Sequence, residues 1–505
     1  MKYYLCGEYD SAIEIDSQTL EKGIIVFGEN SLICAGLYHS LALSYHSKFD
    51  DFVALKYEKK AHEIYESIEG ETSENGVKCL NMIAMYENHL GDYLNAIKDQ
   101  IKVVEIYQSI NSDGEKYATY IGNLSKYYDD YGDYENAIRW GTEALIQTEK
   151  AVGKMHPKYC NVLNTLGITY EHMGEYQDAI RIGEEAITIQ KQLTGELDPD
   201  YSLYLTNLAV SYSNSGQVIK SIKYYEEAIR INKTIFGEKD PNIILPLINL
   251  STSYGKVDEY QKSIKYAEEA LEIIVLFEGK NNLHYATCLN NIGNCYSHLG
   301  KYKEALSALN HSLLIKKELL NIDHPDISAT IINISTVFFE QGDYHSAISI
   351  LEEQLEGINS LYGMYNAEYE TILSNLAVLY SKMGDPFMAL ETNYKVLNLR
   401  EKSLGKGHPD YLQSLVNVSM DYVHIGQYDK ALEALQKCEE NYVASGERFP
   451  SIESNLYNNL AVCYSRNDDF SKSLDYYKKA LALNKLLFGE LSLNYARILD
   501  NIAWV

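Results

Sequence analysis

Amide side chains are the groups in this sequence whose types and spacing most clearly suggest chemistry. Asparagine recurs every 42 residues through most of the chain. It is a weaker helix former than alanine, so its repetition within a helical pattern needs a cause. One amide can donate and accept hydrogen bonds at once, which suits it either to a peptide backbone or to an equivalent amide on a neighbouring helix. This asparagine series comprises Asn123, Asn207, Asn249, Asn291, Asn333, Asn375, Asn417 and Asn459, with Thr165 at one place and Asn81 and Asn501 at its ends.

A second series stands seven residues after the first, two turns further along the same helix face. Six of its nine members are basic or histidine, although the chain has 44 basic and 71 acidic residues. This contrast predicts a groove from Lys256 to Arg466, interrupted by Glu340, that accepts acidic segments through charge-assisted hydrogen bonds. A solvated row that only offsets nearby acidic residues is an equal alternative. We name this series the polar row: Asp130, His172, Asn214, Lys256, His298, Glu340, Lys382, His424 and Arg466.

Motifs for catalysis are missing from the sequence. It has no GxGxxG after a strand, no Walker loop, no HExxH and no GxSxG elbow. Two Gly-Lys pairs, at Gly153 and Gly405, lack the Ser or Thr that a phosphate-binding loop requires. Histidines that recur with the period stand directly before proline, so helix capping explains them better than catalysis does; they are His156, His324 and His408. We therefore predict no catalytic residue and no cofactor.

The eight cysteines form no CxxC pair. Cys288 and Cys295 lie seven residues apart on one predicted helix, but two ligands without further partners make no zinc site. Cys438 takes a place that small apolar residues hold in other repeats. The sequence therefore predicts buried free thiols and no metal site.

A repeating pair of helices must position these side chains. In the first, helix A, each asparagine is followed by an aliphatic residue, a small residue and an aromatic, as in Leu208, Ala209 and Tyr212. Apolar residues at this spacing make one buried helix face. Four residues past the aromatic a glycine should end helix A in a left-handed conformation. Asp258 and Asp468 replace that glycine in two repeats.

The second helix, helix B, carries two small residues seven apart, such as Ala137 and Ala144, which should pack closely on helix A. It should end in left-handed caps at a second glycine series, with Asn321 in the skipped place at 321. Proline then starts the next helix, where Asp198 and Asp240 can cap free amides. The glycines are Gly153, Gly195, Gly237, Gly279, Gly363, Gly405 and Gly489, and the prolines are Pro157, Pro199, Pro241, Pro325 and Pro409.

This pattern resembles the tetratricopeptide repeat, in the 42-residue form typical of kinesin light chains and many bacterial arrays. The phrases GKGHPDY, NVSMDYVHIGQYDKALE and NNLAVCY carry the resemblance, which covers almost the whole chain. It implies an all-α solenoid of about eleven antiparallel helix pairs in a right-handed superhelix, with helix A lining the concave side. In such arrays the asparagines form a ladder that holds an extended peptide. The resemblance and the polar row together predict a peptide-binding groove of Asn207, Asn249, Asn291, Asn333, Asn375, Asn417, Asn459, Lys256, His298, Lys382, His424 and Arg466. The alternative, that the asparagines bridge successive A helices without touching a ligand, stays open.

The repeats are less regular near the start of the chain. Phe49 stands where glycine belongs, and Gly91 comes one residue late. We therefore expect irregular repeats in residues 1–80 and regular ones in 81–505, within one continuous solenoid that ends part-way through a repeat. The apolar residues Trp504 and Val505 suggest that the C-terminal end packs on a further domain or subunit.

Composition narrows the function further. A net charge of −27 repels phosphate backbones and argues against nucleic-acid binding. No run is apolar enough for a membrane span, and MKYYLCGEYD lacks the apolar core of a secretory signal, so we expect a cytoplasmic protein. The resemblance implies a non-enzymatic scaffold that binds a protein or peptide, and the polar row predicts that the bound segment is acidic. The alternative that it leaves open is the sensor array of a larger bacterial signalling or effector protein, with a caspase-like peptidase or kinase output outside this chain.

Overall fold

The computed structural model describes residues 9–110, 114–446, 449–488 and 492–504, and these residues form helices and no strand. The chain divides into two compact units, Met1–Glu259 and Tyr260–Val505, and each is described here by itself. In chain order, eleven A helices are each followed by a B helix among the described residues, with one further helix at either end. The prediction of an all-α solenoid of about eleven helix pairs is confirmed.

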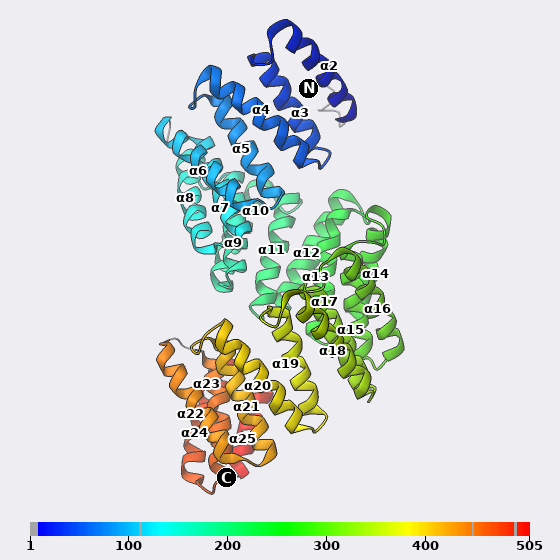
Figure 1. Cartoon of the computed structure of the whole chain (residues 1–505), viewed down its shortest axis with the longest axis vertical. Helices are drawn as coiled ribbons and strands as arrows, with labels where there is room; N and C mark the ends of the chain where they lie inside the picture. Colours follow the sequence, from blue (N-terminus) through cyan, green and yellow to red (C-terminus); the bar gives the residue numbers. More distant parts are fainter. Residues whose placement is uncertain (1–8, 111–113, 447–448, 489–491, 505) are drawn as a thin grey trace. The chain divides into compact units, whose positions relative to one another are not determined.

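Unit 1 alternates A and B helices from α2 to α13 (Figure 1). Its A helices are α3 (Leu32–His46), α5 (Glu74–His89), α7 (Glu115–Tyr131), α9 (Pro157–His172), α11 (Pro199–Asn214) and α13 (Ile244–Lys256), the last preceded by the short 3-10 helix η1 (Pro241–Ile243). Its B helices are α2 (Tyr9–Phe27), α4 (Asp51–Glu69), α6 (Tyr93–Ile110), α8 (Tyr134–Val152), α10 (Tyr176–Thr194) and α12 (Val218–Phe236).

Unit 2 continues the same alternation from α14 to α25. Its B helices are α14 (Tyr260–Phe277), α16 (Tyr302–Leu319), α18 (Tyr344–Tyr362), α20 (Pro386–Ser403), α22 (Tyr428–Ser445) and α24 (Phe470–Phe488). Its A helices are α15 (Leu283–His298), α17 (Pro325–Glu340), α19 (Ala367–Lys382), α21 (Pro409–Ile425), α23 (Pro450–Arg466) and α25 (Leu493–Trp504).

Small residues let the helices of each repeat approach closely. Ala137, Ala144 and Ala305 on B helices are completely buried against their A helices. Successive A helices also touch one another within a unit, for example α7 with α9 and α17 with α19, whereas successive B helices make at most marginal contact in the described residues. Because the inner elements of a curved stack lie closest together, the A helices line the inner side of each unit.

Helix ends follow the predicted positions, with one correction in geometry. Phe49, Asp258 and Asp468, which replace the first glycine, have φ angles of 60–61° and are the only non-glycine residues with positive φ in the described ranges. Four glycines of the second series, Gly153, Gly195, Gly237 and Gly363, have positive φ but extended ψ; Gly153, for example, has φ 80° and ψ 168°. That conformation is nearly exclusive to glycine and is not the left-handed helical cap that we expected.

The expectation for Asn321 is wrong for the same reason. Helix α16 ends at Leu319, and Leu320 takes an extended conformation with φ −126° and ψ 157°. Asn321 has no positive φ, because asparagine tolerates the left-handed helical region but not the glycine-only region used here. Gly489 and Val505 lie outside the described residues, and Trp504 is 90% exposed.

The helix starts are confirmed. Asp198 accepts a hydrogen bond from the Tyr201 backbone nitrogen at 2.9 Å, and Asp240 caps Asn242 at the start of η1. His156, His324 and His408 each use Nδ1 to accept a backbone N–H two residues later. The pre-proline histidines are therefore helix caps.

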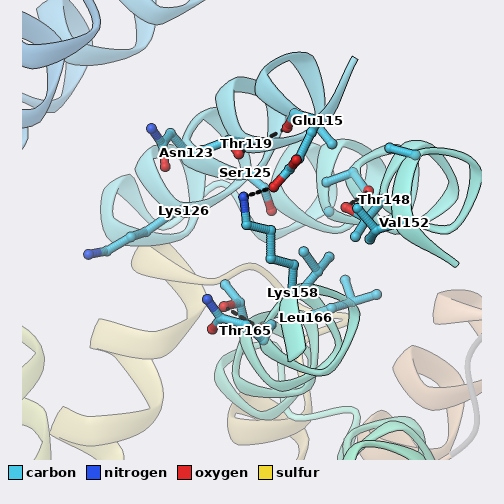
Figure 2. A pocket seen from close by; sticks show the side chains of 17 residues that line it. Glu115, Thr119, Asn123, Ser125, Lys126, Thr148, Val152, Lys158, Thr165 and Leu166 are labelled. Atoms are coloured by element: carbon cyan, nitrogen blue, oxygen red, sulfur yellow. Dashed lines mark hydrogen bonds and ion pairs between the residues drawn. The ribbon is translucent and has the colours of Figure 1, made fainter. Parts of the chain in front are cut away.

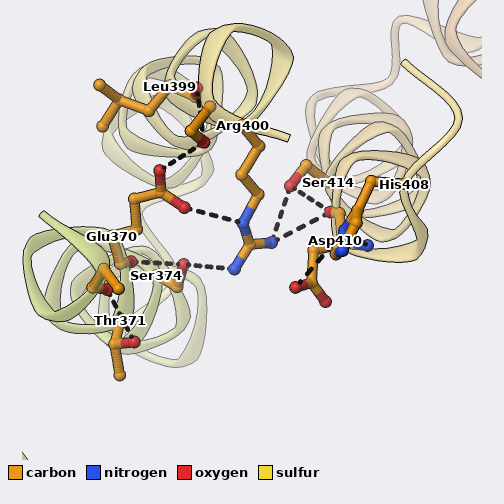
Figure 3. A network of polar contacts seen from close by, with 10 residues as sticks. Glu370, Thr371, Ser374, Leu399, Arg400, His408, Asp410 and Ser414 are labelled. Carbon is orange, nitrogen blue, oxygen red and sulfur yellow. Dashed lines mark hydrogen bonds and ion pairs between the residues drawn. The ribbon is translucent and has the colours of Figure 1, made fainter. Parts of the chain in front are cut away.

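Buried polar side chains join some repeats to the next. Arg400 on α20 donates to the Asp410 carbonyl oxygen at 3.1 Å and to Ser414 Oγ at 2.9 Å on α21, and it faces Glu370 of α19 at 3.7 Å (Figure 3). Lys316, 84 residues earlier, makes the equivalent bonds to Asp326 O and Thr330 Oγ1. The same contact between a B helix and the next A helix thus occurs twice, two repeats apart, with lysine in one case and arginine in the other.

Candidate functional site

Four members of the asparagine series bridge neighbouring A helices. In each, the amide nitrogen donates to an asparagine on the preceding A helix, at 3.0–3.4 Å. The pairs are Asn123 with Asn81, Asn207 with Asn164, Asn333 with Asn290, and Asn501 with Asn458. The acceptors Asn164, Asn290 and Asn458 each stand one residue before the asparagine-series position of their own repeat. Asn81 is their equivalent, so the series position of its repeat comes one residue later than the period predicts. Gly91, which also comes one residue late, is therefore in register with that position.

The other asparagines are engaged differently. Asn375 donates to the Thr371 carbonyl oxygen of its own helix at 2.9 Å, and Asn417 accepts from Gln413 at 3.0 Å. Asn459 is only 5% exposed and accepts from its neighbour Asn458, which leaves it little access to a ligand. Asn249 contacts the Tyr225 hydroxyl, and Asn291 is half-buried in α15. Bridging therefore explains part of the series and not all of it.

Every member of the polar row is exposed and stands at or next to the C-terminal end of an A helix. Backbone carbonyls give that end a partial negative charge, which favours lysine, arginine and histidine there. This gives Lys256, His298, Lys382, His424 and Arg466 a local structural cause. The signal was present in the sequence, because each member of the row stands two residues before the glycine or aspartate that ends helix A with positive φ.

Most of the row also reaches back to the preceding A helix. His172 Nδ1 lies 3.0 Å from Asp129 Oδ2, and that hydrogen bond is the main reason that the pKa of His172 is raised. Lys256 Nζ donates to Ser213 Oγ at 2.9 Å. Other such contacts are Asn214 with Glu171 at 2.6 Å, Asp130 with Asn88 at 2.7 Å, and the Lys382 ammonium 5.4 Å from the centre of the Phe339 ring. His298 instead stacks on Tyr260 of the B helix α14, with the ring centres 4.8 Å apart.

Crevices between successive A helices bring the two series together. Between α17 and α19, Asn375 and Lys382 line one crevice of about 80 Å³ with Phe339. Between α9 and α11, Asn207 and His172 share a crevice of about 210 Å³. Amide, cation and apolar side chains thus face the same openings on the inner side of each unit.

A larger hollow of about 450 Å³ lies in repeats that the predicted groove did not include (Figure 2). It opens between α7, α8 and α9, where Thr165 interrupts the asparagine series and Gly122 and Gly141 leave room. Lys158 of α9 forms an ion pair with Glu115 of α7 across it. Gly122, Gly141 and Thr165 were the sequence signal for this hollow. The signal could not be interpreted from the sequence, because the hollow forms only where the three helices that carry these residues pack together.

The prediction of buried free thiols is confirmed for the described residues. Seven cysteines are buried and unpaired there, and Cys6 lies outside the described ranges. Cys288 is completely buried, and Cys295 Sγ lies 3.1 Å from Ser263 Oγ. Among the described helices, none combines the length and the apolar character that crossing a membrane requires.

Comparison with solved structures gives repeat proteins at low identity. Tetratricopeptide-like repeats of a kinesin light chain from Podosopora anserina match at 18% identity and TM-score 0.37, covering 41% of this chain and 97% of that one. BtubC (BKLC) from P. vanneervenii matches at 19% identity and TM-score 0.38, covering 46% and 91%. Yeast Tom70 matches at 13% identity and TM-score 0.48, covering 100% and 93%. A search of curated proteins found no match.

A family model gives the assignment directly. The model described as tetratricopeptide repeat matches seven overlapping or successive segments, at residues 79–146, 131–192, 200–274, 243–318, 284–359, 368–442 and 453–505. Together these segments cover most of the chain, and they agree with the observed alternation of A and B helices. The chain therefore belongs to the tetratricopeptide repeat family, whose helix pairs form scaffolds for protein interaction.

Proposed function

We propose that this protein is a non-enzymatic scaffold that binds an extended, acidic segment of a partner protein along the inner face of its A helices. The observation that carries the proposal is the crevice shared by Asn375 and Lys382. An amide there can pair with a peptide unit while the ammonium pairs with a carboxylate on the same ligand. Phe339 adds an apolar surface beneath the lysine.

The bridging hydrogen bonds do not use all the donors and acceptors of the asparagine side chains. An asparagine side chain carries two N–H donors and an oxygen with two lone pairs, so one bond leaves capacity for another. Asn375 is half-buried and uses one donor on its own helix. It is well suited to peptide contact, since it shares a crevice with Lys382 and no asparagine bridge is lost if it turns toward a ligand.

An acidic ligand is compatible with a chain of net charge −27. At physiological salt, charges more than about 8 Å apart are largely screened, so the cations nearest to the ligand dominate. Lys382 and Arg466 are exposed and lie on the A-helix face of the same unit. A cytoplasmic location is part of this proposal, and the buried unpaired cysteines support it because a reducing compartment keeps thiols free.

A peptide display selection against the full chain tests the proposal. We expect enrichment of extended sequences that carry Asp or Glu. For a selected peptide, Lys382→Glu should weaken binding roughly tenfold, about 1.4 kcal/mol, with a loss that shrinks in high salt. Lys406→Glu is the matched control, because Lys406 pairs with Glu401 outside the polar row and the change in net charge is identical.

Asn375→Ala should keep the fold, since alanine is the better helix former, and should weaken the same peptide. The combined change of Asn291, Asn333 and Asn375 is less clean, because Asn333 also bridges to Asn290. Lys382→Glu and Arg466→Glu should be partly non-additive if one ligand spans both. Equal binding by Lys382→Glu and wild type, or equal losses in Lys382→Glu and Lys406→Glu, contradicts the proposal.

A further inference from the structure

Three side chains from three successive helices of unit 1 meet at one point. His39 on α3, Glu58 on α4 and Cys79 on α5 each present a ligating atom, and these atoms all lie within 4.8 Å of one another. His39 Nδ1 is 2.8 Å from Glu58 Oε1 and 3.0 Å from Oε2. Glu58 is completely buried, Cys79 is 2% exposed, and the His39 side chain is 16% exposed.

Glu58 departs from the repeat pattern. It stands nine residues after the positive-φ residue Phe49, a position at which every regular repeat has an uncharged side chain or glycine. Burying a carboxylate is costly, and a single ion pair seldom repays that cost. The charge at this position therefore needs a reason beyond packing. The equivalent residues are Gln100, Gly141, Gly183, Tyr225, Ala267, Leu309, Leu351, Asn393, Leu435 and Tyr477.

The donor set identifies the ligand that this cluster would take. Thiolate sulfur, imidazole nitrogen and carboxylate oxygen are the three protein ligands of zinc, and a thiolate disfavours magnesium and calcium. A Zn²⁺ ion bound to one thiolate, one carboxylate and a neutral imidazole has no net charge, which suits a buried place. We propose that His39, Glu58 and Cys79 bind one Zn²⁺ ion, with water as a fourth ligand, and thereby fasten α3, α4 and α5 together.

Proton balance follows from the thiol. Burial, and next the Glu58 carboxylate, raise the pKa of Cys79, so the free protein holds the thiol form. Coordination replaces the thiol proton by the metal ion, and that proton passes to solvent. No oxidant or reductant takes part, and Zn²⁺ keeps its oxidation state.

A second cluster in the same helices serves as an internal comparison. Asp51 lies between two histidines, with His46 Nδ1 at 2.5 Å and His89 Nδ1 at 3.1 Å. All three side chains are at least partly exposed, and this cluster contains no thiol. A metal ion held there lacks a sulfur ligand, so spectroscopy can tell the two places apart.

The test is titration of the chelator-treated full chain with Co²⁺, followed by competition with Zn²⁺. We expect one Co²⁺ ion per chain with a thiolate-to-cobalt charge-transfer band. Cys79→Ser should abolish the band, and Zn²⁺ affinity should fall more than about 100-fold, because loss of an outer partner alone costs roughly 10–100-fold. Glu58→Gln should fold, since Gln100 holds the equivalent place, and should also bind Zn²⁺ more weakly.

Asp51→Asn is the matched control and should bind Co²⁺ with an unchanged band. Circular dichroism confirms the helices of each variant, and Zn²⁺ should raise the melting temperature of wild type and Asp51→Asn only. The proposal is overturned if wild type binds no Co²⁺, if its spectrum lacks the thiolate band, or if Asp51→Asn rather than Cys79→Ser loses the metal.

Discussion

The contact between Gly293 and helix α16 gives a stability prediction whose sign can be worked out. Gly293 holds the small-residue position of α15, where most other repeats carry alanine or serine. A Cβ atom at Gly293 would lie 2.6 Å from Leu309 Cγ and 3.1 Å from the Ala305 carbonyl oxygen. Replacing a helical glycine by alanine gains about 1 kcal/mol, but overpacking a buried site costs about 1–3 kcal/mol. Gly293→Ala should therefore lower the unfolding free energy by about 0–2 kcal/mol.

Gly122→Ala is the matched control. Gly122 also lies inside an A helix, but a Cβ atom there meets only Ala144 Cβ, at 4.0 Å, and extends into the hollow beside it. This variant should keep the helix-propensity gain of about 0.5–1 kcal/mol. The two variants should thus differ by about 1–3 kcal/mol although the chemical change is the same.

Urea unfolding combined with hydrogen exchange is the assay, because a repeat array need not unfold in one step. Gly293→Ala should speed exchange in α15 and α16, and Gly122→Ala should slow it in α7 and α8. In a double-mutant cycle, Leu309→Ala should cost less in the Gly293→Ala background than in wild type, because it removes the clash. Equal stabilisation by both alanines, or an additive cycle, would refute the packing argument.

Three further predictions concern buried groups. Arg400→Lys should change the urea midpoint little, because Lys316 makes the equivalent bonds, whereas Arg400→Met should cost about 2–4 kcal/mol by leaving Glu370 buried without its cation. Burial raises the pKa of Asp421 despite a hydrogen bond from Asn393, so its contribution to stability is present below the unfolded pKa of about 4 and is lost as pH rises through the folded pKa. Asp421→Asn should remove this pH dependence of the unfolding free energy. Urea midpoints of the variant and of wild type, compared at pH 4.5 and at pH 7.5, test this. Ala305→Leu should cost roughly 1–3 kcal/mol, and an unchanged melting temperature would remove the packing role of Ala305.

The fold could be predicted because residues at the ends of each helix mark where that helix begins and ends. A proline after His or Asp starts helix A, and a residue with positive φ ends it, even where Asp258 or Phe49 replaces glycine. These signals act within a few residues and are therefore legible in sequence. Asn321 shows the limit, because the period gave its position but not the ψ angle that separates a glycine-only turn from a left-handed cap.

The candidate site was less predictable, because its properties depend on neighbouring helices. The sequence placed Asn333 and Asn375 at equivalent positions, yet one bridges to Asn290 and the other bonds within its own helix. The sequence showed that the polar row is basic within an acidic chain. It could not show that Lys382 lies close to Phe339 and Asn375, because that proximity arises only when two repeats pack together. Ligand contact at these positions stays a prediction.

Departures from the period carry information that the period itself cannot. A residue that recurs in every repeat must first satisfy the fold, and bridging amides and cations at helix ends do so without a ligand. A residue that breaks the pattern at a buried place, as Glu58 does, weakens the fold unless something compensates for it. Thr165 breaks the asparagine series beside the largest of the hollows described above. Asp51 stands between two histidines, at the position where most other B helices begin with an aromatic residue. In a repeat protein of this kind, aligning the chain with itself and asking which exceptions are buried or meet other exceptions is therefore a direct route to sites that motif searches pass over.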